Sequence, residues 1–422
     1  MHKLENQKIR RAGCELLLAG VLLISTGIFT TACTGINSNE AEAAARQSVW
    51  NDYFRTESIN PDRIAEMENL SMTFGEATMR FAYFVIGEPD ENGFPLFIAM
   101  HGGGATPINE SQFEHMQVYY RTSVEQGVYV AVRGVRDTWD THFNPESFPL
   151  YDRLIENMIL LRNVDPNRVY LMGFSAGGDG VYGITPRMPD RFAAVSMSAG
   201  HPNNVNVYNF QHTPIILQCG DGDRAFNRHL ETARFGIRLA EMHQRFPGFE
   251  YQVNMHVNRG HNFPDNSAQR VPQLVWADSR AWLEFGESDT IRINTNAVDF
   301  LTQHVRTPLP ETVVWDLSTR ASMRQVESFY WLRANHEMTT GLIIANFNPR
   351  NNTITITTED VEDTFYVLLN REMLNFDQPV TLIVNGNSSD LRIRSSREII
   401  EKTTRERGDA NFQFSAVVEI NP

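Results

Sequence analysis

Short apolar runs alternate with helical patterns between residues 70 and 285, and this alternation predicts the fold of that part of the chain. Residues 95–100 (PLFIAM) form a continuous apolar run, which indicates a strand covered on both faces. Apolar positions three or four apart, as in residues 150–161, indicate a helix. Strands that alternate with helices form a parallel sheet, and sites form beyond the carboxyl ends of its strands. The predicted strands are residues 80–86, 95–100, 127–132, 168–172, 192–198, 214–218 and 251–257, and the further predicted helices are residues 176–184, 227–245 and 271–285.

The pattern changes from about residue 294, where short alternating runs replace the alternation of strands and helices. A helical pattern at residues 395–407 and the tight turn Asn385-Gly386-Asn387 also lie in this part. We therefore expect an α/β domain at residues 51–293 and a β-rich, antiparallel domain at residues 294–422. The strands of the β-rich domain are expected at residues 312–315, 328–332, 342–347, 353–357, 364–368, 380–384 and 412–418.

The role of the β-rich domain stays open between a structural or dimer-forming appendage and a module that binds a polymer or carbohydrate. Its aromatic residues Phe329, Tyr330 and Trp331 are consecutive, so they cannot all lie on one face of a strand. This spacing disfavours a flat platform on which sugar rings would stack.

The N-terminus has the pattern of an export signal. Basic residues at positions 3, 8, 10 and 11 precede an apolar stretch at residues 16–32. That stretch ends in FTTAC, which resembles the lipobox of bacterial lipoproteins, where the cysteine becomes the first residue and carries lipid. We expect a signal peptide at residues 1–32, lipidation at Cys33 and a tether at residues 33–50; the alternative is an uncleaved membrane anchor. Either reading gives an exported protein of bacterial type, anchored in a membrane or extracellular.

Composition narrows the class of protein further. The 422 residues carry a net charge of −14, which repels phosphates, so nucleic acid is not an expected partner. Cys14 lies in the signal and Cys33 at the lipid site, which leaves Cys219 as a small buried side chain with no disulfide partner. The sequence has no HExxH, CxxC or Walker motif, so we expect neither a metal nor a cofactor. The oligomeric state is not predicted.

The predicted strand at residues 168–172 leads into Gly173-Phe174-Ser175-Ala176-Gly177, which is followed by a helical pattern. This G-x-S-x-G sequence lies in the strand–turn–helix context that a serine nucleophile requires. The sharp turn would expose the hydroxyl of Ser175, and the amide of Ala176 would point toward an oxyanion. Ser198 also precedes an Ala-Gly pair, but it lacks the glycine two residues before it and is not expected to react.

The predicted strand at residues 95–100 ends in His101-Gly102-Gly103-Gly104. Glycine-rich loops of this HGGG type turn backbone amides toward a developing oxyanion. We expect the amide of Gly103 or Gly104 to serve in this way. His101 is expected to brace the loop rather than to act as a base.

Two further strand ends supply an acid and a base. Asp223 in Cys219-Gly220-Asp221-Gly222-Asp223 is expected to orient a histidine, with Asp221 as the alternative. His261 follows the predicted strand at residues 251–257 and is expected to be the general base. The other candidate histidines are expected within a strand (His256) or on solvent-facing helix positions (His229 and His243).

The chain order Ser175, Asp223, His261 is that of α/β-hydrolases. Residues from about 70 to 290 resemble the exported esterase group of this fold, which includes polyhydroxybutyrate depolymerases and feruloyl or acetylxylan esterases. The resemblance is carried by PLFIAMHGGG, VDPNRVYLMGFSAGGDGVY, PDRFAAVSMSAG, CGDGD and GHNF. It implies hydrolysis of an ester, small or polymeric, through an acyl-enzyme. A serine peptidase similar to the prolyl-oligopeptidase group and a non-catalytic binder on a hydrolase scaffold are the alternatives.

The loop at residues 134–149 contains Trp139, His142, Phe143 and Phe148. Aromatic side chains beyond a strand end can line a substrate pocket. Trp139, His142 and Phe143 are therefore candidates for substrate binding, with ordinary packing as the equal alternative.

Overall fold

The computed structural model describes residues 36–104, 108–256, 258–265, 269–270, 291–292, 296–320, 327–335 and 337–422. Residues 36–422 form one compact unit. The predicted signal peptide, Cys33 and the predicted helix at residues 271–285 lie outside the described residues. In the described part, no helix combines the length and hydropathy needed to cross a membrane.

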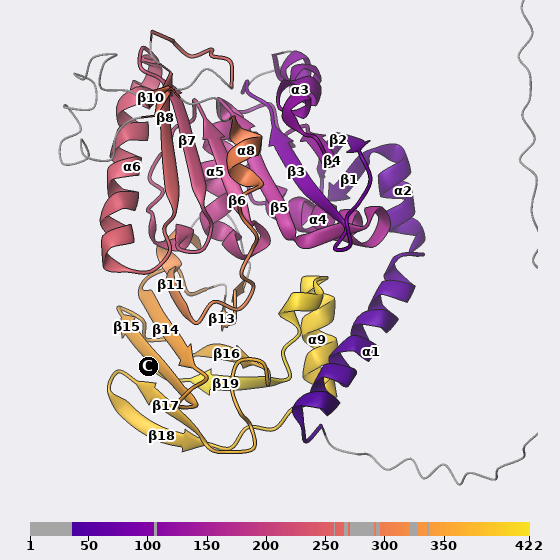
Figure 1. The fold of residues 1–422 in the computed structure, drawn as a ribbon, viewed down its shortest axis with the longest axis vertical. Helices are drawn as coiled ribbons and strands as arrows, with labels where there is room; N and C mark the ends of the chain where they lie inside the picture. The colour runs from indigo at the N-terminus through magenta and orange to yellow at the C-terminus, as the bar shows by residue number, and fades with distance from the viewer. Residues whose placement is uncertain are drawn as a thin grey trace, which may run out of the picture. The chain divides into compact units, whose positions relative to one another are not determined.

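A ten-stranded sheet forms the larger part of this unit (Figure 1). Its order is β1-β2-β4-β3-β5-β6-β7-β8-β9-β10, and the neighbouring strands from β4 through β3 and β5 to β8 are all parallel. Strand β2 runs antiparallel to both of its neighbours. The order and directions of the first eight strands are those of the α/β-hydrolase fold, so the predicted fold class is confirmed. The strands are β1 (Ser71–Phe74), β2 (Ala77–Ile86), β3 (Phe94–Met100), β4 (Gly127–Val132), β5 (Val164–Phe174), β6 (Ala194–Ser198), β7 (Ile215–Gly220), β8 (Tyr251–His256), β9 (Gln269–Arg270) and β10 (Ile291–Arg292).

Strand β3 shows why the continuous apolar runs form the centre of this sheet. All of its residues are buried, and successive side chains point to opposite faces. Leu96 and Ile98 belong to one apolar core, whereas Phe97 and Ala99 belong to the core on the other face. Burying each large apolar side chain contributes about 1.5–3 kcal/mol, so a strand covered on both faces is apolar throughout.

Helices cover both faces of the sheet. The first core includes side chains of α4, α5 and α6, and the second includes side chains of α3 and α8. Two further helices, α1 and α2, precede the first strand. The helices are α1 (Asn39–Glu57), α2 (Pro61–Asn69), α3 (Ile108–Tyr119), α4 (Ser147–Arg162), α5 (Ala176–Ile184), α6 (Arg228–Arg245), α8 (Ala297–Leu301) and α9 (Arg397–Arg407).

Two smaller sheets form the C-terminal part and share one apolar core. One has the order β11-β14-β15-β17-β18 and the other β12-β13-β16-β19. All pairs are antiparallel as predicted, except that β15 pairs with β17 in parallel. The chain leaves the first sheet after β15, forms β16 in the second and returns as β17, which reverses the direction twice. The strands are β11 (Thr312–Asp316), β12 (Ser328–Phe329), β13 (Leu332–Ala334), β14 (Leu342–Asn348), β15 (Thr353–Glu359), β16 (Phe365–Leu369), β17 (Val380–Val384), β18 (Asn387–Leu391) and β19 (Ala416–Ile420).

The predicted strand at residues 328–332 is two strands, because Tyr330 has a positive φ of 53° and turns the chain between β12 and β13. Phe329, Tyr330 and Trp331 are all buried. They pack inside the β-rich part and present no platform for a ligand.

The tether predicted at residues 33–50 is wrong from residue 39 onward, because Asn39–Glu57 form helix α1. Ser38 caps this helix by accepting a hydrogen bond from the amide of Ala41, and the alanines that follow favour helix. Glu42 is 2% exposed and bonds the backbone amide of Arg371 at 2.7 Å and the hydroxyl of Ser415 at 2.5 Å. A buried carboxylate with these partners fixes α1 to the C-terminal part.

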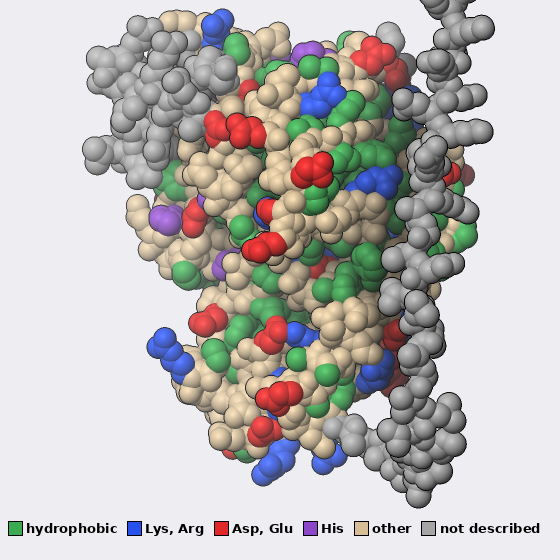
Figure 2. Space-filling view, turned by 45° about the vertical axis from the view of Figure 1, so that its right-hand side comes forward, with side chains coloured by type: hydrophobic (Ala, Val, Ile, Leu, Met, Phe, Trp, Pro, Cys, Tyr) green, Lys and Arg blue, Asp and Glu red, His purple; other side chains and the backbone are tan. Residues whose placement is uncertain are grey.

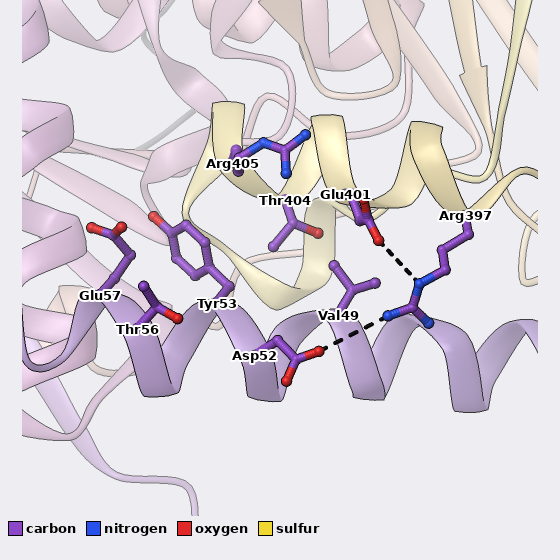
Figure 3. Close-up of a pocket in the computed structure, with 9 residues that line it drawn as sticks. All are labelled: Val49, Asp52, Tyr53, Thr56, Glu57, Arg397, Glu401, Thr404 and Arg405. Carbon is purple, nitrogen blue, oxygen red and sulfur yellow. Dashed lines mark hydrogen bonds and ion pairs between the residues drawn. The ribbon is translucent and has the colours of Figure 1, made fainter.

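Helices α1 and α9 face one another across a cavity of about 260 Å³ (Figure 3). Arg397 of α9 lies 3.9 Å from Asp52 of α1 and 3.0 Å from Glu401 on its own helix. Arg397, Asp52 and Glu401 therefore satisfy one another, and we assign no ligand to this cavity.

The β-rich part meets the α/β part through buried ion pairs. Asp190 pairs with Arg407 at 2.8 Å, and Arg306, which pairs with Asp409 at 2.7 Å, also donates to the backbone oxygen of Asp190 at 2.8 Å. Asp190 also accepts a hydrogen bond from the backbone amide of Tyr330 at 3.0 Å. The domain boundary predicted at residue 294 falls before α8, although the side chains of α8 belong to a core of the large sheet.

Acidic and basic side chains are interspersed with apolar ones on the face shown in Figure 2. They do not gather there into one large charged patch. The net charge of the chain is therefore not concentrated on that face.

Candidate active site

Ser175 lies on the turn between β5 and α5, with φ of 59° and ψ of −119°. This backbone conformation is strained for a residue with a side chain, and neighbouring glycines make it possible. A Cβ atom at Gly173 would lie 2.1 Å from the carbonyl oxygen of Gly177. A Cβ atom at Gly177 would lie 2.2 Å from the carbonyl oxygen of Met100. The two glycines of the motif therefore let the backbone fold tightly around the serine.

Two hydrogen bonds join the three residues that the sequence singled out. The Oγ of Ser175 lies 2.9 Å from Nε2 of His261, and Nδ1 of His261 lies 2.7 Å from Oδ2 of Asp223. Ser175, Asp223 and His261 follow the carboxyl ends of β5, β7 and β8, which belong to one parallel stretch of the sheet with β6 between β5 and β7. With Nδ1–H donating to Asp223, Nε2 is free to accept the hydroxyl proton of Ser175.

The structure separates the two acidic candidates. Asp223 is 2% exposed and contacts His261. The carboxylate of Asp221 instead accepts a hydrogen bond from the backbone amide of Asn258 at 3.1 Å. Only Asp223 is placed to orient the histidine.

Ser198 and two of the other candidate histidines, His229 and His256, lie in packed positions. The hydroxyl of Ser198 accepts from the hydroxyl of buried Tyr120 at 3.0 Å. His256 stacks on Phe263 with ring centroids 3.8 Å apart, and burial lowers its pKa to about 3. His229 is buried and bonds the backbone oxygen of Asp223 at 2.9 Å, so its predicted solvent-facing position is wrong. His243 is exposed as expected.

The glycine loop after β3 lies beside Ser175. Gly103 has a φ of 122°, and it lines a cavity together with Ser175 and Ala176. A Cβ atom at Gly103 would lie 2.2 Å from Oδ1 of Asn109, so only glycine fits there. The Oδ1 atom of Asn109 also accepts a hydrogen bond from the amide of Gly104 at 2.7 Å. The amide of Gly104 is thus already used, which corrects its assignment as an oxyanion donor and leaves Gly103.

His101 braces the same loop. Burial lowers its pKa to about 4, which keeps it neutral. It donates from Nδ1 to the carbonyl oxygen of Gly102 at 2.6 Å and accepts at Nε2 from the amide of Gly134 at 3.1 Å. The loops that follow β3 and β4 are therefore tied together through one imidazole.

The three aromatic-loop candidates have different surroundings. Trp139 is 57% exposed and lines the cavity at Ser175. Phe143 is buried against Gly183 and lines an adjoining cavity. His142 is 1% exposed and donates from Nε2 to the carbonyl oxygen of His101 at 2.9 Å, which favours the packing alternative for this residue.

The cavity at Ser175 has a volume of about 370 Å³, and several residues that the sequence did not single out also line it, Asp179 and Arg228 among them. Asp179 lies in the first turn of α5, and burial raises the pKa of its carboxyl to about 7. Arg228 begins α6 and lies 4.0 Å from the carboxylate of Asp223. An acidic residue in the otherwise apolar segment 176–184 was the one available signal for Asp179.

A separate cavity of about 430 Å³ lies on the His261 side of the site, lined by Tyr119, Phe174 and Phe263 among others. Phe174 packs edge-on against His261, with ring centroids 5.5 Å apart. The site therefore has an aromatic cavity on one side and a cavity with charged residues on the other. Among the described residues, no group of three or more His, Cys, Asp and Glu is arranged to hold a metal ion.

No protein-family model matches the chain, and no curated protein matches its sequence significantly. A solved thermostable esterase is 19% identical over 56% of this chain and 63% of its own length, with a TM-score of 0.39. A poly(3-hydroxybutyrate) depolymerase from Bordetella parapertussis is 15% identical over 44% of this chain and 79% of its own, with a TM-score of 0.35. An S-formylglutathione hydrolase from Agrobacterium tumefaciens is 16% identical over 46% of this chain and 87% of its own, with a TM-score of 0.34. At these TM-scores the matches carry no argument about function, so the chemistry rests on the geometry of the site.

Proposed function

We propose that this protein is a serine hydrolase that cleaves carboxylic esters through an acyl-enzyme. The observation that carries the proposal is the pair of hydrogen bonds, 2.9 Å and 2.7 Å, that joins Ser175 to His261 and His261 to Asp223. A hydroxyl, an imidazole and a buried carboxylate in this order form an activated nucleophile. The strained turn at Ser175, which lines a cavity, supports the same reading.

In the first half of the reaction, Oγ of Ser175 attacks the ester carbonyl carbon while Nε2 of His261 takes the hydroxyl proton. The negative charge that develops on the carbonyl oxygen is stabilised by the backbone amides of Gly103 and Ala176, each worth about 3–4 kcal/mol. The bond to the alcohol oxygen then breaks, and His261 donates its proton to that oxygen. The products of this half are the free alcohol and an ester of Ser175.

In the second half, a water molecule attacks the acyl-enzyme while His261 takes one of its protons. The bond between the acyl carbon and Oγ breaks, and the proton returns to Ser175. The carboxylic acid leaves, and the hydroxyl of Ser175 is restored. Asp223 keeps His261 in the tautomer with a proton on Nδ1 and stabilises the imidazolium in both halves.

A panel of p-nitrophenyl acetate, p-nitrophenyl butyrate and peptide p-nitroanilides tests the proposal on the purified protein. We expect ester turnover that falls about 10³-fold or more in Ser175→Ala, because the nucleophile is lost. Ser111→Ala, an exposed change on α3, is the matched control and should keep full activity. Fast anilide cleavage with negligible ester turnover would favour the peptidase alternative instead.

We further propose that the chain is exported and that Cys33 carries lipid, which would hold the protein at a membrane. The support is the basic and apolar pattern of residues 1–32 and the FTTAC sequence. Intact-mass measurement of protein from a bacterial membrane fraction tests this. A mature chain that begins at a lipid-modified Cys33 is expected, and a chain that retains residues 1–32 would contradict the cleavage.

A further inference from the structure

A second cavity, of about 270 Å³, adjoins the one at Ser175. The two cavities share Trp139, Asp179 and Asn203 as lining residues. Beyond these shared residues, the second cavity is lined by Arg187 and Ser318, among others. A substrate that reacts at Ser175 can therefore extend past Asp179 into the second cavity.

One wall of the second cavity comes from the β-rich part. Ser318 follows β11, and its amide donates to Oδ1 of Asp316 at 2.7 Å. Asn209 of the α/β part exchanges two hydrogen bonds with the backbone of Asp316, at 2.8 Å and 3.1 Å. Asn206 bonds the carboxylate of the same aspartate. These bonds fix the segment that carries Ser318 against the catalytic part, so the wall is built into the fold.

Asp179 presents a polar group where the two cavities meet. Its Oδ1 accepts a hydrogen bond from the backbone amide of His201 at 2.7 Å. Among the residues that the structure describes, Oδ2 has no hydrogen-bond partner. The amide of Asp179 donates to the carbonyl of Ser175 at 2.9 Å, which fixes the carboxyl relative to the nucleophile. A carboxyl oxygen that lines a cavity and has no partner in the described part of the protein can accept a hydrogen bond from a donor on a ligand.

The lining of the second cavity indicates the class of ligand. Carboxyl, amide and hydroxyl groups of Asp179, Asn203 and Ser318 can accept or donate hydrogen bonds, and Trp139 offers an exposed apolar face. One acidic residue and one basic residue, Asp179 and Arg187, both line the space, so neither a cation nor an anion is favoured by charge. An uncharged group that carries several hydroxyls satisfies these partners.

We propose that the second cavity is a binding subsite for an uncharged, hydroxyl-bearing part of the ester substrate, that Asp179 and Trp139 select this part at the entrance, and that the β-rich domain supplies the far wall. This proposal rests on the proposed ester hydrolysis at Ser175. It gives the β-rich domain a role in substrate binding in addition to its structural one.

Two pairs of esters test the proposal. They distinguish hydroxyls on the acyl part of the ester from hydroxyls on its alcohol part. The acyl pair is p-nitrophenyl 3-hydroxybutyrate and p-nitrophenyl butyrate, and the alcohol pair is glucose 6-acetate and cyclohexylmethyl acetate. The members of the acyl pair differ only in one hydroxyl, whereas those of the alcohol pair differ in the hydroxyls and in the ring oxygen of glucose. We expect kcat/KM for the hydroxylated member to be at least about tenfold higher in one pair, which corresponds to one well-placed hydrogen bond.

Variants of the lining residues then test whether the preference for the hydroxylated ester depends on the second cavity. Ser318→Trp fills the far wall and Asp179→Leu removes the carboxyl, so either change should reduce the ratio of kcat/KM within the preferred pair toward one. Ser389→Trp, on the exposed strand β18, is the matched control and should leave the ratio unchanged. Equal kcat/KM within both pairs for the parent protein, or a ratio that survives both cavity variants, would overturn the proposal.

A binding measurement separates failure of this subsite from failure of the proposed reaction. Saturation-transfer NMR on Ser175→Ala reports contact with glucose 6-acetate without any turnover. Contact that Ser318→Trp abolishes in the same background supports the subsite even if the parent protein hydrolyses no ester. Absence of contact for both hydroxylated esters would overturn the subsite while leaving ester hydrolysis to be judged by Ser175→Ala itself.

Discussion

The backbone amide of Asp179 donates a 2.9 Å hydrogen bond to the carbonyl oxygen of Ser175, which fixes an acidic side chain one helical turn from the proposed nucleophile. Burial is the main cause that raises the pKa of this carboxyl from its ordinary 3.8 to about 7. The amide of His201, Arg228 and His261 act in the opposite direction and favour the charged form. The site therefore contains a carboxyl that changes its charge near neutral pH.

The raised pKa of Asp179 predicts a loss of stability with rising pH. The folded protein keeps this proton up to about pH 7, whereas the unfolded chain releases it near 3.8, so the free energy of unfolding falls between these values. Asp179→Asn does not titrate. We expect its stability relative to the parent to increase by up to about 4 kcal/mol between pH 4 and pH 8. Urea unfolding of both proteins at the two pH values measures this, and a constant difference would contradict it.

Asp223→Asn should lower kcat of ester hydrolysis by about 10³–10⁴-fold, because an amide can hold His261 in the wrong tautomer. The fold should persist, since asparagine has nearly the same shape. Asp221→Asn is the matched control, because the side chain of Asp221 bonds the amide of Asn258 rather than the histidine. Initial rates with p-nitrophenyl acetate test the pair, and equal losses in both variants would contradict the assignment.

Asn109→Ala should weaken the glycine loop that holds the oxyanion. The change removes the acceptor for the half-buried Gly104 amide and a 2.9 Å bond to Asp137, at a cost of about 1 kcal/mol for each lost hydrogen bond. We expect kcat to fall about tenfold to a hundredfold, which is less than the loss of a donor itself, because the Gly103 amide remains. Ser111→Ala on the same helix should be neutral. Unchanged kcat in Asn109→Ala would show that the loop needs no such support.

Arg306→Ala should destabilise the protein by about 3–5 kcal/mol, because it leaves Asp409 buried without its partner. The α/β and β-rich parts belong to one compact unit, so we expect a single unfolding transition in both the parent and the variant. Arg350→Ala, at an exposed position, is the control. Two separate transitions in calorimetry of the parent protein would contradict this account of the junction.

The sequence predicted the sheet and the residues at its strand ends because both are local signals. Ser175, Asp223 and His261 each follow an apolar run at a glycine-containing turn, so parallel pairing of those runs brings them to one edge.

The tether predicted at residues 33–50 was misread, although Ser38 followed by Glu40 and Glu42 is a helix start. Small polar residues fit either state, and the burial of Glu42 depends on the distant Ser395 and Ser415.

The other differences between the sequence-based predictions and the structure depend on tertiary contacts, which no local sequence pattern shows. The sequence does not distinguish Gly103 from Gly104 as an oxyanion donor. The position of Asn109 decides between them, because its side chain accepts the hydrogen bond of the Gly104 amide. His142 lies in a loop with Trp139, but its ring is held by His101 and Tyr151. Asp179 becomes part of the site because α5 packs against the residues around His201.

The central claim is that Ser175 is a nucleophile activated by His261, and covalent labelling tests it most directly. The folded protein is incubated with a fluorophosphonate probe, and the modified residue is located by peptide mass spectrometry. The account predicts one label per chain, on Ser175, which is lost in Ser175→Ala and is slowed strongly in His261→Ala while circular dichroism shows both variants folded. Absence of label on Ser175 in the folded parent protein, or labelling that His261→Ala does not slow, would contradict it.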